Sequence, residues 1–135
     1  MAEIADSFDY ALIRVVPRVE RGELINVGVI VACATKRFLA AKIRLDPARL
    51  LALDPTIDVA EIEGALSSIP LIAAGDPLGG PISALPRGER FHWLVAPRSA
   101  VIQTSPVHTG ICRDPAVALD ELIAKLVEVQ RGGCA

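Results

Sequence analysis

Hydrophobic residues in the first third of the chain follow the two-residue repeat of β-strands. Segment 8–16 (FDYALIRVV) is rich in β-branched and aromatic residues and is followed by a proline, which predicts a strand. Segment 24–34 is apolar at both alternating sets of positions, which predicts a strand covered on both faces. Segment 38–45 alternates more cleanly, and its Lys42 and Arg44 indicate that one face lies toward water.

The first two of these strands are expected to form an antiparallel hairpin around the charged loop 17–23. Antiparallel pairing of the two strands across this loop places Arg14 opposite Asn26 and Leu12 opposite Gly28. The second strand is apolar on both faces, so its second face needs a cover. We expect that cover to come from the glycine- and proline-rich segment farther along the chain or from another protein chain.

Three later segments carry the signals of helix starts. Asp46 followed by a proline predicts a short helix at 46–53. Asp58, with Glu61 three residues later, forms a capping box. Asp114 followed by a proline begins the last predicted helix. The apolar stripes with helical spacing are Val59, Ile62, Leu66 and Ile69 in the second helix and Leu119, Leu122, Ile123 and Leu126 in the last.

Residues 70–90 interrupt this pattern with several prolines and glycines and predict a long irregular loop. Loops of that length are usually functional or mobile, and a tolerated insertion is the alternative. Segments 91–96 (FHWLVA) and 100–105 (AVIQTS) then predict two strands around the turn PRS.

The elements together predict an α+β fold. We expect an antiparallel sheet of two hairpins and the strand at 38–45, packed against two main helices that begin at Asp58 and Asp114. A chain of 135 residues suits one domain. The predicted organisation is a single α+β domain at 1–131 and a frayed tail at 132–135.

Composition and charge narrow the classes of function. Lys and Arg number 14 against 16 Asp and Glu, which gives a net charge of −2, and no long basic run offers a surface for nucleic acid. The three cysteines, Cys33, Cys112 and Cys134, lack the spacing of a zinc site, and Cys33 suits a buried apolar position. The sequence shows neither a secretory signal nor a membrane-spanning apolar stretch. We expect a cytoplasmic protein with no membrane segment, metal or cofactor.

Polar residues and one glycine from the two predicted hairpins form the candidate set for binding a ligand or a partner. Arginine forks suit phosphates and carboxylates, and glycine lets another backbone approach. The structural alternative is that Asn26 satisfies a backbone group, Gly28 accommodates a bulky neighbour, and Arg21 forms a solvated ion pair with Glu23. The set consists of Arg14, Arg21, Glu23, Asn26, Gly28, Arg98, Ser99, Gln103, Ser105 and His108.

Arg14 is the centre of the binding hypothesis, with Asn26 beside it on the floor of a polar site. An arginine on an inner strand needs a partner, because a buried unpaired charge costs several kcal/mol. The sequence offers Glu23, the C-terminal carboxylate or a bound anion as that partner. Arg98 and His108 would close the site if the second hairpin packs beside the first.

Two long segments carry a family resemblance. They are YALIRVVPRVERGELINVGVIV, in which R-x-x-P precedes R-G-E-x-x-N-V-G-V, and FHWLVAPRSAVIQTSPVHTGICRDP. Both resemble the DUF3037 family, which groups bacterial proteins of unknown function. The resemblance brings no catalytic residues. It implies an accessory role beside a HipA-like kinase.

Two functions therefore stay open. The first is an accessory or regulatory protein that binds another protein, with a HipA-like kinase as the partner that the resemblance implies. The second is an enzyme or sensor that binds a small anionic or phosphate-containing ligand at the Arg/Asn/Ser cluster. The sequence has no nucleophile elbow, P-loop or dinucleotide fingerprint, which favours a role other than catalysis. It leaves a homo-oligomer open.

Overall fold

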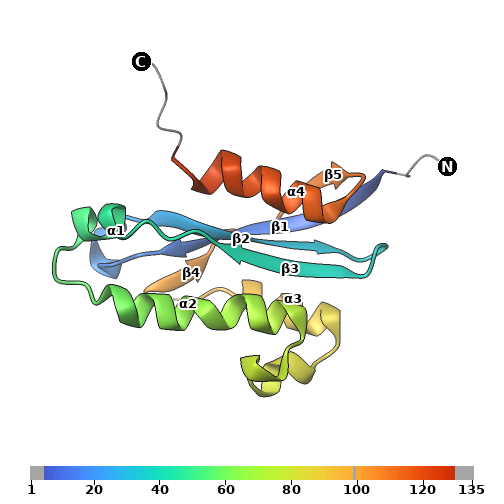
Figure 1. Ribbon diagram of the computed structural model, residues 1–135, viewed down its shortest axis with the longest axis horizontal. Helices are drawn as coiled ribbons and strands as arrows, with labels where there is room; N and C mark the ends of the chain where they lie inside the picture. The colour runs from blue at the N-terminus through green and yellow to red at the C-terminus, as the bar shows by residue number, and fades with distance from the viewer. Residues whose placement is uncertain (1–4, 99, 130–135) are drawn as a thin grey trace, which may run out of the picture.

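A five-stranded antiparallel sheet lies between helices on both faces (Figure 1). The computed structural model describes residues 5–98 and 100–129. The strands are β1 (Asp6–Val15), β2 (Ile25–Cys33), β3 (Phe38–Ile43), β4 (Ile102–Thr104) and β5 (His108–Cys112). The helices are α1 (Pro47–Leu53), α2 (Val59–Ala74), α3 (Arg87–Val95) and α4 (Pro115–Leu122), which continues into the π-helical turn η4 (Ile123–Val127). The predicted α+β class with an antiparallel sheet is confirmed.

Strand β1 is the central strand of the sheet. It pairs with β2 along one edge, which confirms the first hairpin, and Arg14 lies opposite Asn26 as predicted. The register then shifts between Ile13 and Arg14, so Gly28 lies opposite Ile13. The predicted pairing of Leu12 with Gly28 is therefore wrong, because β2 accommodates one extra residue in a bulge.

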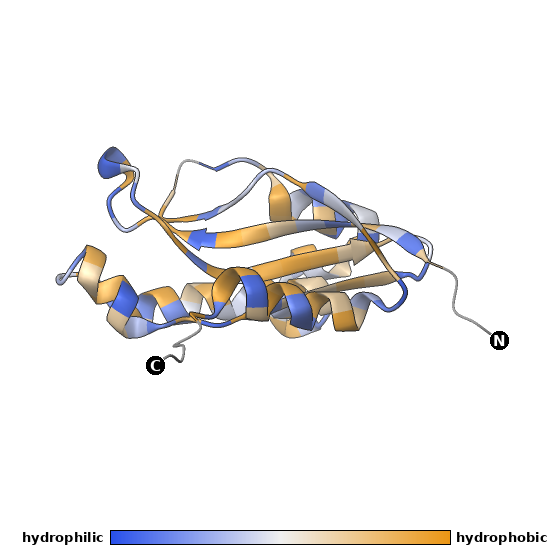
Figure 2. Cartoon of the chain, turned by 90° about the horizontal axis from the view of Figure 1, so that it is seen from above, coloured by the Kyte–Doolittle hydropathy of each residue, from blue (hydrophilic) through white to orange (hydrophobic). Residues whose placement is uncertain are grey.

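Two apolar clusters fill the spaces on the two faces of the sheet. On the first face, Ile30 belongs to a cluster with Leu66 of α2 and Leu94 of α3. On the second face, Val31 belongs to a cluster with Leu119 of α4. Figure 2 shows the predominantly apolar strands beside helices of alternating polarity. The prediction that β2 is covered on both faces is confirmed. Its second cover is α4, so the expectation of the glycine- and proline-rich segment or another chain is wrong.

Strand β3 is less exposed than its alternating pattern predicted. Lys42 forms an ion pair with Asp120 of α4, and Phe38 and Ala40 pack against the second apolar cluster. Helix α4 therefore covers part of the face that was expected to lie toward water.

Aspartates begin α1, α2 and α4 as the sequence predicted. The side chains of Asp46, Asp58 and Asp114 each accept a hydrogen bond from a backbone N–H two or three residues later, at 3.0 to 3.1 Å. These bonds satisfy amide groups that have no partner inside the first turn of a helix.

The prediction of an irregular loop at 70–90 is wrong. Helix α2 continues through Pro70 to Ala74 and ends at Gly75, whose backbone is left-handed with φ 73°. Two 3-10 turns follow, η2 (Pro77–Gly79) and η3 (Pro81–Ala84). The proline at the start of each turn lacks an N–H at a position where the turn leaves that group unbonded, so this segment is folded despite its composition.

The prediction of a strand at 91–96 is also wrong, because residues 91–95 lie in α3. Phe91 and Leu94 are buried while His92 and Trp93 are exposed, which is the spacing of a helix face and not of a strand. The helix begins at Arg87, inside the segment that was assigned to the loop.

The predicted second hairpin does not form. Strand β4 occupies part of the predicted segment 100–105, but it pairs with β1 at Ile13 to Val15, and β5 pairs with β1 at Asp6 to Tyr10. The two short strands therefore lie end to end along one edge of β1. The long central strand, and not a local turn, sets their positions.

Candidate functional site

A row of polar side chains crosses the sheet on the face that carries α4. Arg14 of β1 lies between Asn26 of β2 and Gln103 of β4 in the strand register. The Nε of Arg14 donates a hydrogen bond to Oδ1 of Asn26 at 3.3 Å. Gln103 donates from its side-chain amide to the carbonyl of Ala100 at 2.7 Å. Three members of the predicted set are thus brought together.

Asn26 also connects this row to the end of the last helix. Its Nδ2 donates to the backbone carbonyl of Leu126 in η4 at 3.3 Å, and Nη1 of Arg49 donates to the carbonyl of Val127 at 3.4 Å. Carbonyls at a helix end carry a partial negative charge that favours nearby cations. The structural alternative for Asn26, that it satisfies a backbone group, is confirmed, and Asn26 connects Arg14 to this helix end.

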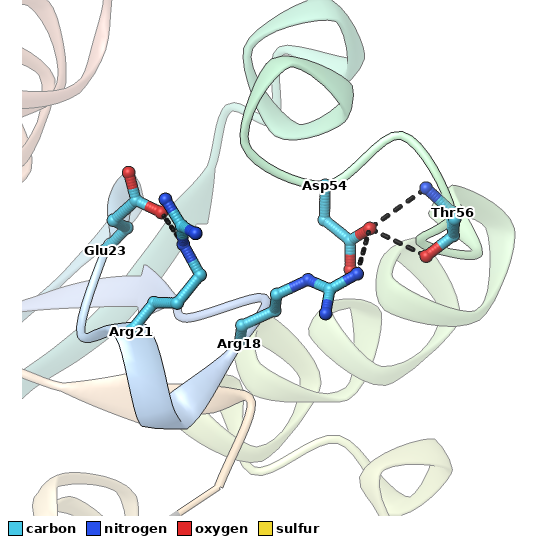
Figure 3. Close-up of polar contacts among 5 residues, drawn as sticks. All are labelled: Arg18, Arg21, Glu23, Asp54 and Thr56. Atoms are coloured by element: carbon cyan, nitrogen blue, oxygen red, sulfur yellow. Dashed lines mark hydrogen bonds and ion pairs between the residues drawn. The ribbon is translucent and has the colours of Figure 1, made fainter.

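The remaining predicted carboxylate is engaged elsewhere. Glu23 forms an exposed ion pair with Arg21 in the β1–β2 loop (Figure 3). The hydrogen bond from Arg21 to Glu23, and then the charge of Glu23, raise the pKa of the Arg21 guanidinium. The solvated pair expected from the sequence is confirmed. Among residues 5–98 and 100–129, Arg14 forms no salt bridge with a carboxylate.

A second polar contact beside this loop was missed in the sequence. Asp54 is buried and accepts hydrogen bonds from the backbone N–H and the hydroxyl of Thr56, at 3.0 and 2.7 Å. Arg18 reaches the same carboxylate at 3.6 Å (Figure 3). The side-chain and backbone hydrogen bonds from Thr56, followed by Arg18, hold the pKa of Asp54 below its usual value. The Asp-Pro-Thr spacing of 54–56 is the signal that indicates such a turn.

Gly28 is required by the close approach of β3. A Cβ atom added at this position would lie 2.5 Å from the backbone oxygen of Lys42 and 2.9 Å from Cδ1 of Ile43. Gly28 therefore accommodates neighbouring residues, as the structural alternative proposed. No ligand is needed to explain it.

Ser105 continues the hydrogen bonding to β1 at the break between β4 and β5. Its backbone N–H donates to the carbonyl of Leu12 at 2.8 Å, and its Oγ accepts the N–H of Leu12 at 2.8 Å. The hydroxyl also donates to the carbonyl of Pro106. With 2% of its surface exposed, Ser105 has a structural role, because its hydroxyl replaces a strand-to-strand hydrogen bond.

Arg98 does not close the predicted site. Its guanidinium lies over the ring of Trp93, 4.3 Å from the ring centroid, and donates to the carbonyl of the same residue at 2.7 Å. Trp93 belongs to α3, which packs with α2 on the opposite face of the sheet from α4. Ser99 lies outside the described residues.

His108 extends the polar row along β5. It pairs with Tyr10 in the register, and the two rings stand 5.4 Å apart. Helix α4 and η4 pack against β2 and β3, which leaves the β1 side of this face more accessible. We call this area the open face. It consists of Tyr10, Arg14, Gln103 and His108, with the buried Leu12 between Tyr10 and Arg14. Sequence alternation puts Tyr10, Leu12 and Arg14 on one side of β1, so Tyr10 was a detectable member that the candidate set omitted.

Comparison with known families identifies the group to which this chain belongs. The profile of the family described as protein of unknown function (DUF3037) matches residues 10–127 of the 135-residue chain. The chain belongs to the DUF3037 family. The resemblance noted in the sequence is thereby confirmed. Searches of curated proteins and of solved structures found no match.

Burial limits the reactivity of the two described thiols of this DUF3037 protein. Cys33 and Cys112 are buried and free, which confirms the apolar role predicted for Cys33. Burial raises the pKa of Cys112, and nearby Cys33 raises it further, so the thiol stays protonated and weakly nucleophilic. Cys134, like the predicted tail at 132–135, lies outside the described residues.

Two other properties apply to residues 5–98 and 100–129 of this family member. No three His, Cys, Asp or Glu side chains among them gather closely enough to hold a metal ion. No helix there has the length and hydrophobicity needed to span a bilayer.

Proposed function

We propose that this DUF3037 protein is an accessory protein that acts by binding another protein through the open face. The observation that supports this role is the composition and accessibility of that face. Tyr10, Arg14 and Gln103 are half-buried around Leu12, and His108 is exposed. Tyrosine and arginine are the side chains that most often supply binding energy in protein interfaces, and half-buried ones are already held in position.

A HipA-like kinase is the partner class to test first, because the family resemblance implies an accessory role beside such a kinase. The proposed setting is the bacterial cytoplasm. In this role the protein supplies a preformed rigid surface and no catalytic group. The kinase would change its activity or stability when that surface is occupied.

Co-expression of the protein with a HipA-like kinase, followed by affinity purification and a kinase assay, tests this function. The double variant Tyr10→Ala/His108→Ala should lose the complex, since it removes both rings of the open face. Arg87→Ala is the control, because Arg87 lies on α3 at the opposite side of the sheet, and it should retain the complex. Absence of any complex with the unaltered protein, together with unchanged kinase activity, would count decisively against the proposal.

A small anionic or phosphate-containing ligand at Arg14 is the second candidate, either for a sensor or for an enzyme. The observation that favours it is a half-buried guanidinium that bonds Asn26 through Nε and forms no salt bridge within residues 5–98 and 100–129. The two Nη groups of an arginine match a phosphate or carboxylate in a two-pronged geometry.

Thermal-shift measurements over nucleotides and phosphorylated metabolites test this second candidate, because a ligand that binds the folded state raises the melting temperature. A hit should disappear in Arg14→Ala and persist in the control Arg87→Ala. A lower melting temperature in Arg14→Ala with no ligand response in the unaltered protein would assign Arg14 a structural role alone.

A further inference from the structure

Strand β5 forms an edge of the sheet that no strand of residues 5–98 and 100–129 covers. It pairs with β1 on its inner side only. The opposite edge strand, β3, has α2 and α4 on its two faces and carries Lys42, which is paired with Asp120. The outer edge of β5 presents free backbone N–H and C=O groups to which a strand can be added, and β5 carries no lysine.

Exposed apolar side chains gather at this same edge. Ile111 within β5 exposes 78% of its surface, Val107 just before the strand exposes 43%, and Val117 in the first turn of α4 exposes 50%. Natural edge strands usually carry lysine, proline or a bulge that prevents pairing. The sequence of β5, HTGIC, contains no lysine and no proline.

A groove of about 390 Å³ lies between β5 and α4. Phe8, Cys112 and Leu122 contribute apolar surface to it, and Glu121 and Lys125 contribute charges of both signs. The apolar surface at the edge is thus continuous with the helix layer. It extends beyond the backbone of the strand.

We propose that β5 is a homodimer interface, at which a second copy of this chain pairs antiparallel through its own β5 across a two-fold axis at Ile111. The two Ile111 side chains are then direct cross-strand neighbours. His108 at the start of one strand lies beside Asp114 of the second copy, because antiparallel pairing brings opposite strand ends together. The sheets of the two copies become one continuous sheet.

Charge at the strand ends favours a second copy as the occupant. The start of β5 offers the imidazole of the exposed His108 as a donor, and the exposed Asp114 after the strand offers the carboxylate oxygen that does not cap α4, so the edge is complementary to itself. A strand of this length is only about 17 Å long. A stable interface buries roughly 800 Å² on each partner, so side chains outside the strand must also contribute to the buried area. Val107 and Val117 supply apolar area beyond the strand and would contribute to the interface.

Light scattering coupled to size-exclusion chromatography tests the assembly on the full chain. The unaltered protein should elute with twice the 14.3 kDa mass of one chain. Ile111→Lys should halve the measured mass while circular dichroism stays unchanged. Leu78→Lys is the matched control, since Leu78 exposes 82% of its surface and lies in η2, and it should keep the dimer mass. A monomeric unaltered protein, or a dimer that survives Ile111→Lys, would overturn the proposal.

A cysteine cross-link tests the register separately. In a Cys134→Ser background, Ile111→Cys places two thiols across the proposed axis. Copper(II) phenanthroline should join them as a disulfide, because two copper(II) centres each accept one electron while two protons leave. Thr109→Cys, which lies opposite Arg113 of the second copy, should cross-link far less. Equal cross-linking of both variants, or none in a dimer, would refute pairing at Ile111.

The two proposals can fail independently. The dimer is measured without any kinase or ligand, and its key residue, Ile111, is not part of the open face. His108 belongs to both surfaces, so Ile111→Lys and not a His108 variant separates the two proposals. A monomer that still binds the kinase would remove the dimer and leave the proposed function. A dimer that binds no partner would do the reverse.

Discussion

Arg14 and Asn26 lie directly opposite each other on β1 and β2, and the Nε of Arg14 donates to Oδ1 of Asn26 at 3.3 Å. The amide of Asn26 donates onward to the carbonyl of Leu126 at 3.3 Å. One polar pair therefore connects the first hairpin with the end of the last helix. This connection accounts for an asparagine within the most hydrophobic run of the chain, whether or not a ligand also binds Arg14.

Removing the amide of Asn26 should destabilise the protein. Asn26→Ala leaves a helix-end carbonyl and the Arg14 Nε without their partner, and the expected cost is about 1–3 kcal/mol of unfolding free energy. Urea denaturation measures it. In a double-mutant cycle with Arg14→Ala, the two changes should be coupled by about 0.5–3 kcal/mol. Strictly additive effects would show that the hydrogen bond between them contributes nothing.

Two glycine substitutions should change the stability of the protein in opposite directions. Gly28→Ala should lower stability by about 1–3 kcal/mol, because the new methyl group meets the backbone oxygen of Lys42. Gly64→Ala should raise stability by up to about 1 kcal/mol, since Gly64 lies within α2 and an added Cβ meets no atom within 4 Å. Thermal unfolding of both variants decides the matter. Equal effects would contradict the tight packing of β2 against β3.

Ser105→Ala should be costly although it removes a single oxygen. The backbone N–H of Leu12 loses its acceptor at the break between β4 and β5, and an unsatisfied buried group costs about 1–3 kcal/mol. Ser67→Ala is the control, because Ser67 is exposed and bonds only within its own helix. Chemical denaturation should show a clear loss for the first variant and less than about 0.5 kcal/mol for the second. Similar small losses would mean that water replaces the Ser105 hydroxyl.

Local signals explain how much of the fold could be predicted. The first hairpin, the caps at Asp46, Asp58 and Asp114, and the contact of Arg14 with Asn26 all depend on residues close in sequence or on one register. The bulge next to Ile13 displaced Gly28 by one position, because a single extra residue in β2 leaves no pattern in the sequence.

Contacts between distant parts of the chain explain the features that the sequence did not predict. Segment 91–96 has strand-like composition, but its burial follows a helix that begins four residues earlier at Arg87. Strand β5 is short and contains Gly110, against which the ring of Phe8 packs, and only the length of β1 creates a place for it. The hydrogen bond from the Leu12 N–H to Ser105 could not be foreseen, because the chemistry of a serine hydroxyl is the same whether it faces a ligand or an amide of the sheet.

Asp54 should make the stability of the protein depend on acid pH. Its folded-state pKa lies below the ordinary value because Thr56 donates two hydrogen bonds to it and Arg18 lies nearby. The unfolded chain therefore binds this proton more tightly than the folded protein. The stabilisation from Asp54 is complete above the unfolded pKa of about 3.9 and is lost as pH falls through the folded value.

The variant Asp54→Asn isolates this contribution. It should be less stable than the unaltered protein at neutral pH, and the difference should shrink as pH falls below about 4, because the unaltered carboxylate then becomes protonated as well. Thr56→Val removes the hydroxyl that lowers the pKa of Asp54 most. Like Asp54→Asn, this variant should make the stability of the protein depend less on pH. The unfolding free energy of both variants is measured by urea denaturation from neutral to acid pH. Stability curves of Asp54→Asn and the unaltered protein that run parallel across the whole range would show that Asp54 titrates alike in the folded and unfolded states.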